Sequence, residues 1–371
     1  MKIAFIGDIA FFGRFCIHQN PKALESFQEV KKAMDGCDYV VGNLETPLVE
    51  NGVKLGSKSA YISGHPDNIK ILEYLGINAV NLSNNHIFDF GEEGYKSTTN
   101  ILDKSGIDWF GCEDKIHYLN HPSGENIAFH GYCSLNTNPI GYDESGSKPS
   151  INHLSFHDVI NNFSKIKDAG YFNVMSIHSG FEHINIPSRD DIDFARYLST
   201  IDDYFYFGHH PHVLQGIEKI NNSIIAYSLG NFCFDDIYDE RTENPLVKQS
   251  VNNKESAICI LDIQGGEIVE HKTIDFFIGD NELKVVDSGK MSEYSNMLSF
   301  DMNCYSEERT RQIEGVIKKR NSSRDFKWFI SRFRLSTFFR ILESYLNKNR
   351  YSRLFYKPLM KTIHNEQKRK H

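Results

Sequence analysis

Acidic, amide and imidazole side chains follow several predicted strands of this 371-residue chain, at the point where each strand ends. In open α/β sheets, ligands bind at the edge formed by the carboxyl ends of the strands. A carboxylate can bridge two metal ions while imidazoles complete each coordination shell. We therefore predict a hydrolytic centre with one or two divalent ions (Mn, Fe, Zn or Mg) and six candidate ligands: Asp8, Glu45, Asn85, His178, His210 and His212.

Each candidate also has a simpler explanation. Asp8 could cap a turn, Glu45 could be a surface carboxylate, and Asn85 could form an Asx turn with its own backbone. A single histidine such as His178 is more often a hydrogen-bonded core residue than a metal ligand. Because the six residues recur at successive strand ends, together they favour a metal site.

The elements that must position these residues follow an alternating pattern. Short β-rich runs alternate with longer polar segments of helical character, which predicts an α/β fold with helices flanking central β-sheet structure. Helices are expected at about 22–34, 67–75, 92–105, 156–168 and 190–201. The expected strands are KIAFIGD, YVVGNLE, AVNLSNN, NIAFHGYC, FNVMSIH, YFYFGHH and SIIAYSLGNF, followed by a hairpin of AICILDI and EIVEHKTIDFFI.

Six ordered motifs carry a family resemblance over residues 1–236. They resemble the motifs of the CapA family of capsule (poly-γ-glutamate) synthesis proteins, which is similar to the calcineurin-like metallophosphoesterases. The resemblance implies a calcineurin-like metallophosphoesterase sandwich, here with a C-terminal basic helical extension. The motifs are GDIAFFGR, VVGNLETPL, AVNLSNNHIFDFGEEGYKSTTNILDKSGI, SIHSGFEH, YFGHHPHVLQGIE and IAYSLGNFCFDD.

The resemblance also implies a role for each candidate ligand. Asp8 and His212 would bind one metal, and Glu45 would take the bridging place that an aspartate holds in the wider superfamily. The second metal would be bound by the remaining three candidates: Asn85, His178 and His210.

Two further residues and one departure matter for catalysis. The resemblance implies that His86 stabilises charge on the leaving group or a phosphoryl oxygen and that Asp89 orients it; alternatively, His86 is a helix-entry residue hydrogen-bonded to Asp89. The wider superfamily usually has Asp-x-His at the first strand, whereas this chain has Ala10 two residues after Asp8. The first metal site is therefore one imidazole short, and one-ion and two-ion centres both stay open.

Three residues are candidates for binding substrate. Arg14 could clamp a carboxylate or phosphate, or be a surface cation. Glu182, next to His183, could line the site or belong to a solvated turn. Asn231, after Gly230, could present backbone N–H groups to an anionic substrate or form an ordinary turn.

Charge divides the chain into two parts. The formal net charge is −8, but residues 1–306 carry −20 and residues 307–371 carry +12. We expect a metallophosphoesterase-like domain over 1–286, a linker over 287–306 and a basic, aromatic-rich helical tail over 307–371. The composition, 40% hydrophobic and 13% aromatic, excludes general disorder.

The sequence favours a cytoplasmic protein. We expect neither a signal peptide nor a transmembrane anchor, because the first apolar run breaks at Gly7 and Asp8 and no run reaches the ~18 residues that a span needs. Seven widely spaced cysteines without a C-x-x-C pair indicate reduced thiols and argue against a zinc site built of cysteines.

The tail interleaves aromatic and basic residues over 324–361. We favour peripheral contact with the inner face of the membrane, with docking on the chain's own body or in an oligomer as the alternative. No nucleic acid partner is expected, because the body is acidic. At helical spacing, one face holds Trp328, Leu335, Phe338, Phe339, Leu342 and Leu346, and the other holds Phe326, Phe329, Ile330 and Phe333.

The leading hypothesis is a metal-dependent hydrolase or transferase in the synthesis of a capsule or other extracellular polymer, acting on a phosphoryl or acyl centre. Its expected partners are an anionic polymer or its precursor and the capsule synthesis machinery. One alternative is a non-catalytic polymer-binding or assembly component at the membrane, which the alanine at position 10 supports. A second is a general metal-dependent phosphodiesterase.

Overall fold

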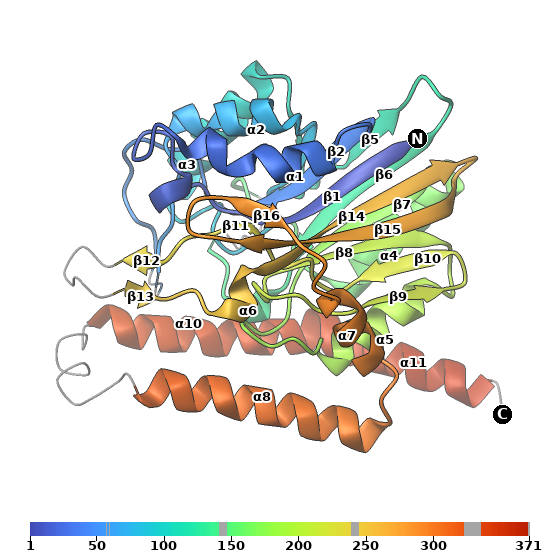
Figure 1. The fold of residues 1–371 in the computed structure, drawn as a ribbon. Helices are drawn as coiled ribbons and strands as arrows, with labels where there is room; N and C mark the ends of the chain where they lie inside the picture. Colours follow the sequence, from blue (N-terminus) through green and yellow to red (C-terminus); the bar gives the residue numbers. More distant parts are fainter. Residues whose placement is uncertain (57, 59, 141–146, 239–244, 323–334, 370–371) are drawn as a thin grey trace.

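Two β-sheets pack face to face at the centre of the molecule, with helices on both outer surfaces (Figure 1). The computed structural model describes residues 1–369, apart from 57, 59, 141–146, 239–244 and 323–334. The arrangement confirms the expected α/β class with helices flanking central sheets.

The first sheet contains both parallel and antiparallel strands. Strands β1 to β4 are parallel, whereas β14, β15 and β16 add on antiparallel, and the short β11 pairs in parallel with the carboxyl end of β1. The strands in sheet order are β16 (Leu283–Val285), β15 (Glu267–Ile278), β14 (Glu255–Gln264), β1 (Lys2–Ile9), β2 (Tyr39–Leu44), β3 (Ala79–Asn81) and β4 (Asp108–Phe110), with β11 at Asn231–Cys233.

The second sheet has a parallel centre and two antiparallel edges. Strands β6, β7, β8 and β10 are parallel, and β5 and β9 flank them. In order, the strands are β5 (His117–Asn120), β6 (Asn126–Cys133), β7 (Phe172–His178), β8 (Tyr204–His209), β10 (Ser223–Ala226) and β9 (Ile217–Ile220). A separate pair joins β12 (Ile237–Tyr238) and β13 (Pro245–Val247).

The consecutive apolar residues of β1 reflect burial on both faces of the strand. Ile3 and Phe5 contribute to the core between the two sheets, where Phe5 meets Phe205 at a ring-centroid distance of 4.4 Å. Ala4 and Ile6 point the other way, into the core beneath the outer helices. Since successive side chains of a strand alternate between faces, a strand covered on both sides needs an unbroken apolar run.

Helices cover each outer surface of the sandwich. Helices α1 (Gln28–Ala33), α2 (Ile69–Leu75) and α3 (Gly91–Lys104) cover the first sheet, and α4 (Phe156–Asp168) and α5 (Arg189–Leu198) cover the second. Helix α5 begins where Ser188 accepts a hydrogen bond from the backbone N–H of Asp191. Short 3-10 helices occur at Gly13–Phe15, Ala23–Phe27, Pro66–Asn68 and Leu135–Thr137.

One predicted strand is divided between the two sheets. The run SIIAYSLGNF forms β10 in the second sheet and β11 in the first, so its prediction as one strand is wrong. Gly230, just before β11, has φ +74°, a conformation that glycine adopts without steric cost. The change of sheet at this point brings Asn231 beside Asp8 of β1.

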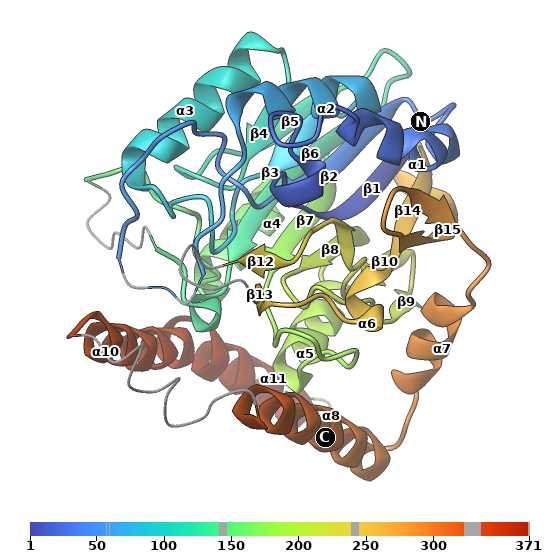
Figure 2. The same ribbon diagram turned by 60° about the vertical axis from the view of Figure 1, so that its left-hand side comes forward.

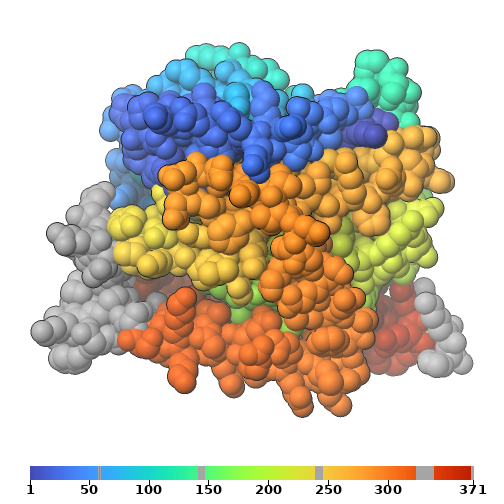
Figure 3. Space-filling view, viewed as in Figure 1, coloured from blue at the N-terminus to red at the C-terminus, as the bar shows by residue number. Residues whose placement is uncertain are grey.

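The region after β16 packs onto the body. Residues 287–306, expected as a linker, include helix α7 (Lys290–Met297), whose Met291 and Tyr294 are buried in the core between the sheets. The described part of the tail forms α8 (Met302–Ser322), α10 (Leu335–Tyr351), a π-helical turn (Ser352–Tyr356) and α11 (Lys357–Arg369). These helices lie along the side of the body that carries α5 (Figures 1 and 2). Figure 3 shows α7 and α8, in orange, as a continuous part of this face of the molecule.

The tail is attached through its aromatic residues. Phe355 is fully buried and meets Phe194 of α5 at a ring-centroid distance of 4.9 Å, and Tyr351 and Leu359 join the same core. Tyr351 also donates a hydrogen bond to Asp190. Docking on the body, which we expected only as the alternative to membrane contact, is therefore what this part of the tail does.

Another face of the tail is solvent-exposed and apolar. Helix α10 exposes Phe338, Phe339, Ile341, Leu342, Tyr345 and Leu346. The expected faces containing Trp328, Phe326, Phe329, Ile330 and Phe333 lie outside the described residues, as does the side chain of Leu335. Among the described helices, none combines the length and the apolar character needed to cross a membrane.

Candidate metal centre

A close approach between chain segments positions Asp8 at the end of β1. A Cβ atom at Gly7 would lie 1.9 Å from the carbonyl oxygen of Gly230, so only glycine fits there. The backbone N–H of Asp8 donates to that same oxygen over 3.0 Å. Asp8 thereby sits beside Asn43 of β2 and Asn231 of β11, with its side chain fully buried.

Asp8, Glu45 and His212 form the first part of a polar cluster. Each offers a ligand atom, and these atoms all lie within 4.8 Å of one another, so the three residues form a potential metal-binding triad. Nδ1 of His212 is 3.4 Å from Oδ2 of Asp8, and its Nε2 is 4.0 Å from Oε2 of Glu45. All three residues are buried.

His178, Asn85 and His210 form the second part. Nε2 of His178 lies 2.9 Å from Oδ1 of Asn85 and 3.2 Å from Nδ1 of His210. Nδ1 of His178 lies 3.7 Å from Oε1 of Glu45, which joins the two parts. The structure thus brings all six candidate ligands into one buried cluster at the carboxyl ends of strands from both sheets.

The loop after β8 holds its histidines in a strained backbone. His210 has φ +93° and His212 has φ +55°, in the left-handed region that non-glycine residues rarely adopt. Such strain costs about 1–3 kcal/mol per residue and is found most often at functional sites. Here the strain lies at the two loop residues that the sequence placed in the metal site.

The two carboxyl groups experience opposite electrostatic environments. Burial raises the pKa of Asp8, but hydrogen bonding and charge from His209, together with the charge of His212, outweigh burial and lower the pKa below its ordinary value. Burial, together with the negative charge of Asp8, raises the pKa of Glu45 well above its ordinary value. Two buried carboxylates this close repel each other, and either protonation of one of them or a cation between them relieves the repulsion.

Two of the candidate imidazoles, His178 and His210, are held in the neutral form that can bind a metal. Burial and the neighbouring histidines lower the pKa of His178 well below its ordinary value. Burial lowers the pKa of His210 to about 4, against the opposing charge of Glu182. A neutral imidazole has a ring nitrogen lone pair available for coordination.

The residues present fit a divalent ion. Oε2 of Glu45 is buried and has no hydrogen-bond partner among the described residues, and an unpaired buried carboxylate oxygen is costly. Carboxylate, amide and neutral imidazole groups converge on the same small volume, and this mixed N/O set suits ions such as Zn, Mn or Fe. A bound ion would satisfy the oxygen that the protein leaves unpaired.

His86 and Asp89 lie beside the cluster and are joined by a lysine. Nδ1 of His86 is 2.7 Å from Oδ2 of Asp89 and 3.0 Å from Nζ of Lys58. Lys58 also donates to Oδ1 of Asp89 over 2.7 Å and to the carbonyl oxygen of Asn85. Burial and the charge of Lys58 lower the pKa of His86, so its ring is neutral at pH 7.

Three polar residues of this region were not among the candidates predicted from the sequence. Asn43 donates to Oδ1 of Asp8 over 2.9 Å, and its place at the end of the second predicted strand was the available signal. Nδ1 of His209 lies 3.0 Å from the same oxygen, bringing an imidazole to Asp8 although residue 10 is alanine. Lys58 comes from an irregular segment where no motif marked it.

The three candidate substrate-binding residues occupy different surroundings. Arg14 forms ion pairs with Asp235 and Asp280, at 3.7 and 3.8 Å. Glu182 has 44% of its side chain exposed and pairs with Arg320 of α8 at 3.6 Å.

The third candidate, Asn231, is fully buried rather than open to a ligand. Its Oδ1 lies 2.9 Å from Nδ1 of His212, so its side chain orients that ring.

Together, the paired sheets and this cluster define an α/β sandwich of the metallophosphoesterase-like class. Residues 2–236 match the family model described as bacterial capsule synthesis protein PGA_cap, so the chain belongs to this family. All six candidate ligands lie within the matched residues.

Two relatives are named as proteins of capsule or PGA biosynthesis. The chain is 29% identical over 258 residues to the PGA biosynthesis protein CapA of Bacillus subtilis (strain 168), covering 67% of each chain. It is 27% identical over 247 residues to the capsule biosynthesis protein CapA of Bacillus anthracis, covering 62% of this chain and 59% of that relative.

Among solved structures, the crystal structure of a hypothetical protein from Thermus thermophilus is similar to this chain. Its TM-score is 0.46 at 14% identity, with 75% of this chain and 99% of that one covered.

Proposed function

We propose that this protein is a metal-dependent hydrolase or transferase of capsule polymer synthesis that acts at a phosphoryl or acyl centre. The observation that supports it is the buried convergence of Asp8, Glu45 and His212 with an unpaired carboxylate oxygen. One ion would be held by this triad, and a second by Asn85, His178 and His210. Bound ions would supply Lewis acidity and lower the pKa of a coordinated water.

The surrounding residues would orient the proposed metal ligands and stabilise the substrate. Asn43 and His209 hold Oδ1 of Asp8, and Asn231 holds the ring of His212. Nδ1 of His86 is engaged by Asp89 and Lys58, which leaves Nε2 as the ring nitrogen for a substrate oxygen. With the Nδ1 proton donated to the Asp89 carboxylate, Nε2 of the neutral ring presents a lone pair and would act as a general base toward a substrate hydroxyl or a water. Donation to developing negative charge would instead require the protonated ring.

The proposed substrate is an anionic polymer or its precursor, handled together with the capsule synthesis machinery. The two CapA relatives, one named for PGA biosynthesis and the other for capsule biosynthesis, support this class. Nζ of Lys58 is 3.0 Å from Nδ1 of His86 and forms an ion pair with Asp89 at 2.7 Å, so it fixes the His86–Asp89 pair beside the proposed binding site.

Metal analysis of purified protein tests the centre. Wild type should retain one or two ions per chain, while Asp8→Asn and His210→Ala should lose most of the metal because each removes a ligand. Asp262→Asn and His271→Ala are matched controls on β14 and β15, far from the strand ends that form the centre. Unchanged metal content in both centre variants would reject the assignment.

A second candidate function is a non-catalytic assembly component that binds polymer at the same site. The absence of an imidazole at position 10 favours it, since the first metal site then lacks one expected ligand. Capsule restoration in a deletion strain distinguishes the two functions. Equal restoration by wild type and by the metal-depleted variants would support assembly and reject catalysis.

The exposed face of α10 supports peripheral membrane contact by this otherwise body-docked tail. Phe338, Phe339 and Leu342 are at least 44% exposed on a helix that also carries basic residues. A Phe338→Ser, Phe339→Ser double variant should weaken binding to anionic vesicles about tenfold by removing apolar insertion. Co-sedimentation measures this, and wild-type protein that stays in the supernatant would contradict it.

A further inference from the structure

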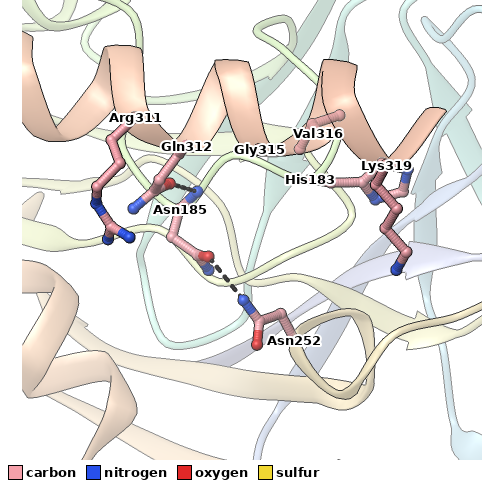
Figure 4. A pocket seen from close by; sticks show the side chains of 8 residues that line it. All are labelled: His183, Asn185, Asn252, Arg311, Gln312, Gly315, Val316 and Lys319. Carbon is pink, nitrogen blue, oxygen red and sulfur yellow. Dashed lines mark hydrogen bonds between the residues drawn. The ribbon is translucent and has the colours of Figure 1, made fainter. Parts of the chain in front are cut away.

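A cavity of about 300 Å³ lies between helix α8 and the segment that follows β7. In Figure 4, side chains of α8 form one wall and the 183–185 backbone with α6 (Val251–Lys254) forms the other. Oε1 of Gln312 accepts from the backbone N–H of Asn185 over 2.9 Å, and Asn252 donates to Oδ1 of Asn185 over 3.2 Å. The lining residues are His183, Asn185, Asn252, Arg311, Gln312, Gly315, Val316 and Lys319.

The cavity wall is bonded directly to the loop of the metal centre. The backbone N–H of His183 donates to the carbonyl of Pro211, between the two candidate ligands of that loop, over 2.8 Å. Nδ1 of His183 accepts from Asn253, whose amide also donates to the carbonyl of His212, each over 2.8 Å. A chain bound in the cavity would therefore lie next to a chain segment bound at the centre.

Helix α8 is fixed in place rather than loosely apposed. Tyr305 and Arg309 both donate to the carbonyl of Pro187, and the guanidinium of Arg309 lies 5.3 Å from the ring centroid of Phe181. Further along the helix, Arg320 pairs with Glu182. These contacts pre-form the cavity, so a ligand need not order it on binding.

The charge of α8 suits an anionic ligand. Its last eight residues, 315–322, include Lys318, Lys319 and Arg320 and no acidic residue. The rest of the chain up to residue 306 carries −20, which repels a polyanion at long range. The basic end of α8 therefore provides local attraction beside an otherwise unfavourable surface.

We propose that this cavity is an accessory subsite that binds a carboxylate-bearing segment of the polymer beside the segment held at the metal centre. Lys319 supplies the charge, and the amides of Gln312 and Asn252 with the ring of His183 supply polar contacts. The subsite lies partly on α8, beyond the residues that match the family model. It rests on the proposed function for the identity of the polymer.

Two variants change the subsite, and a third is their control. Lys319→Glu reverses the charge of a lining residue. Gly315→Phe fills the cavity, since a Cβ at Gly315 meets open space and glycine is not required by its backbone there. Lys318→Glu makes the same charge change at an exposed neighbour that does not line the cavity.

The experiment is a titration of metal-free, full-length protein with a fluorescent poly-γ-glutamate oligomer, followed by anisotropy. Lys319→Glu and Gly315→Phe should each weaken binding about tenfold, and Lys318→Glu no more than about twofold. Circular dichroism confirms folding of each variant.

Equal weakening by Lys319→Glu and Lys318→Glu would overturn the subsite in favour of general charge attraction. Absence of wild-type binding would overturn it too, as would anionic vesicles competing fully with the oligomer, which would indicate a lipid surface instead. Because the titration needs no metal, these outcomes are independent of the metal analysis that judges the proposed function.

Discussion

The candidate metal centre and the C-terminal tail are built on opposite principles. In the centre, polar side chains are buried at strand ends and in the loops that follow them, and Asn43 of the first sheet contacts both Asp8 and His178. In the tail, a few aromatic residues such as Phe355 attach surface helices to the core formed by the second sheet and its helices. Local sequence motifs therefore indicate the candidate metal centre, whereas the position of the tail depends on packing between distant segments.

The largest expected effect tests whether the tail shares the core of the body. Phe355→Ala should lower the free energy of unfolding by about 3–5 kcal/mol, because it leaves a cavity against Phe194. Phe339→Ala, on the exposed face of α10, should change it by less than about 0.5 kcal/mol. Urea denaturation measures both, and equal effects would mean that the tail does not share the body's core.

Metal addition should stabilise the fold through the candidate metal centre. Free ion at a hundredfold excess over its dissociation constant should stabilise wild type by about 2.7 kcal/mol, because only the folded chain assembles the site. Phe339→Ala should keep this gain and Asp8→Asn should lose it. Thermal unfolding with and without chelator reports the difference, and an equal shift in Asp8→Asn would place the ion elsewhere.

Lowering the pH should reduce the free energy of unfolding by a smaller amount, through a histidine near the charge of Arg350 in the tail. Burial and the charge of Arg350 lower the pKa of His153 to about 4, below the ordinary 6.5 of an unfolded histidine. At pH 5 the unfolded chain therefore binds the proton more readily, so stability falls as pH decreases from 6.5 towards 4. This residue should account for about 1.5 kcal/mol of loss between pH 6.5 and 5.

The matched variant is His153→Gln, which cannot titrate in that range. Its unfolding free energy should depend less on pH than that of wild type, measured by urea denaturation at both pH values. Identical pH dependence in the two proteins would show that His153 carries none of the effect.

Sequence reasoning reached the strand ends because their chemistry is local. Asp8 and His178 each lie at the end of a recognisable apolar run, so their places at the carboxyl ends of buried strands follow from the class of fold, although the two strands belong to different sheets. His209 was hidden because it is the last residue of a strand run, and which face its side chain takes depends on register. Lys58 reaches Asp89 from an irregular segment, which no periodicity describes.

The tail was harder to predict for a different reason. A basic, aromatic helix has the same composition whether it lies on a membrane or on its own protein, and only the complementary surface decides. That surface, around Phe194 and Tyr197 of α5, is assembled from segments more than a hundred residues earlier. The division of SIIAYSLGNF between sheets was missed because its apolar pattern continues across the bend.

The candidate ligands come from both sheets, and this has a mechanical consequence. Asp8 and Glu45 belong to the first sheet and its loops, whereas His178, His210 and His212 follow strands of the second. An ion bound by both sets would cross-link the two sheets. Any sliding of one sheet over the other would then lengthen bonds between the ion and its ligands, so the bound ion would oppose that motion.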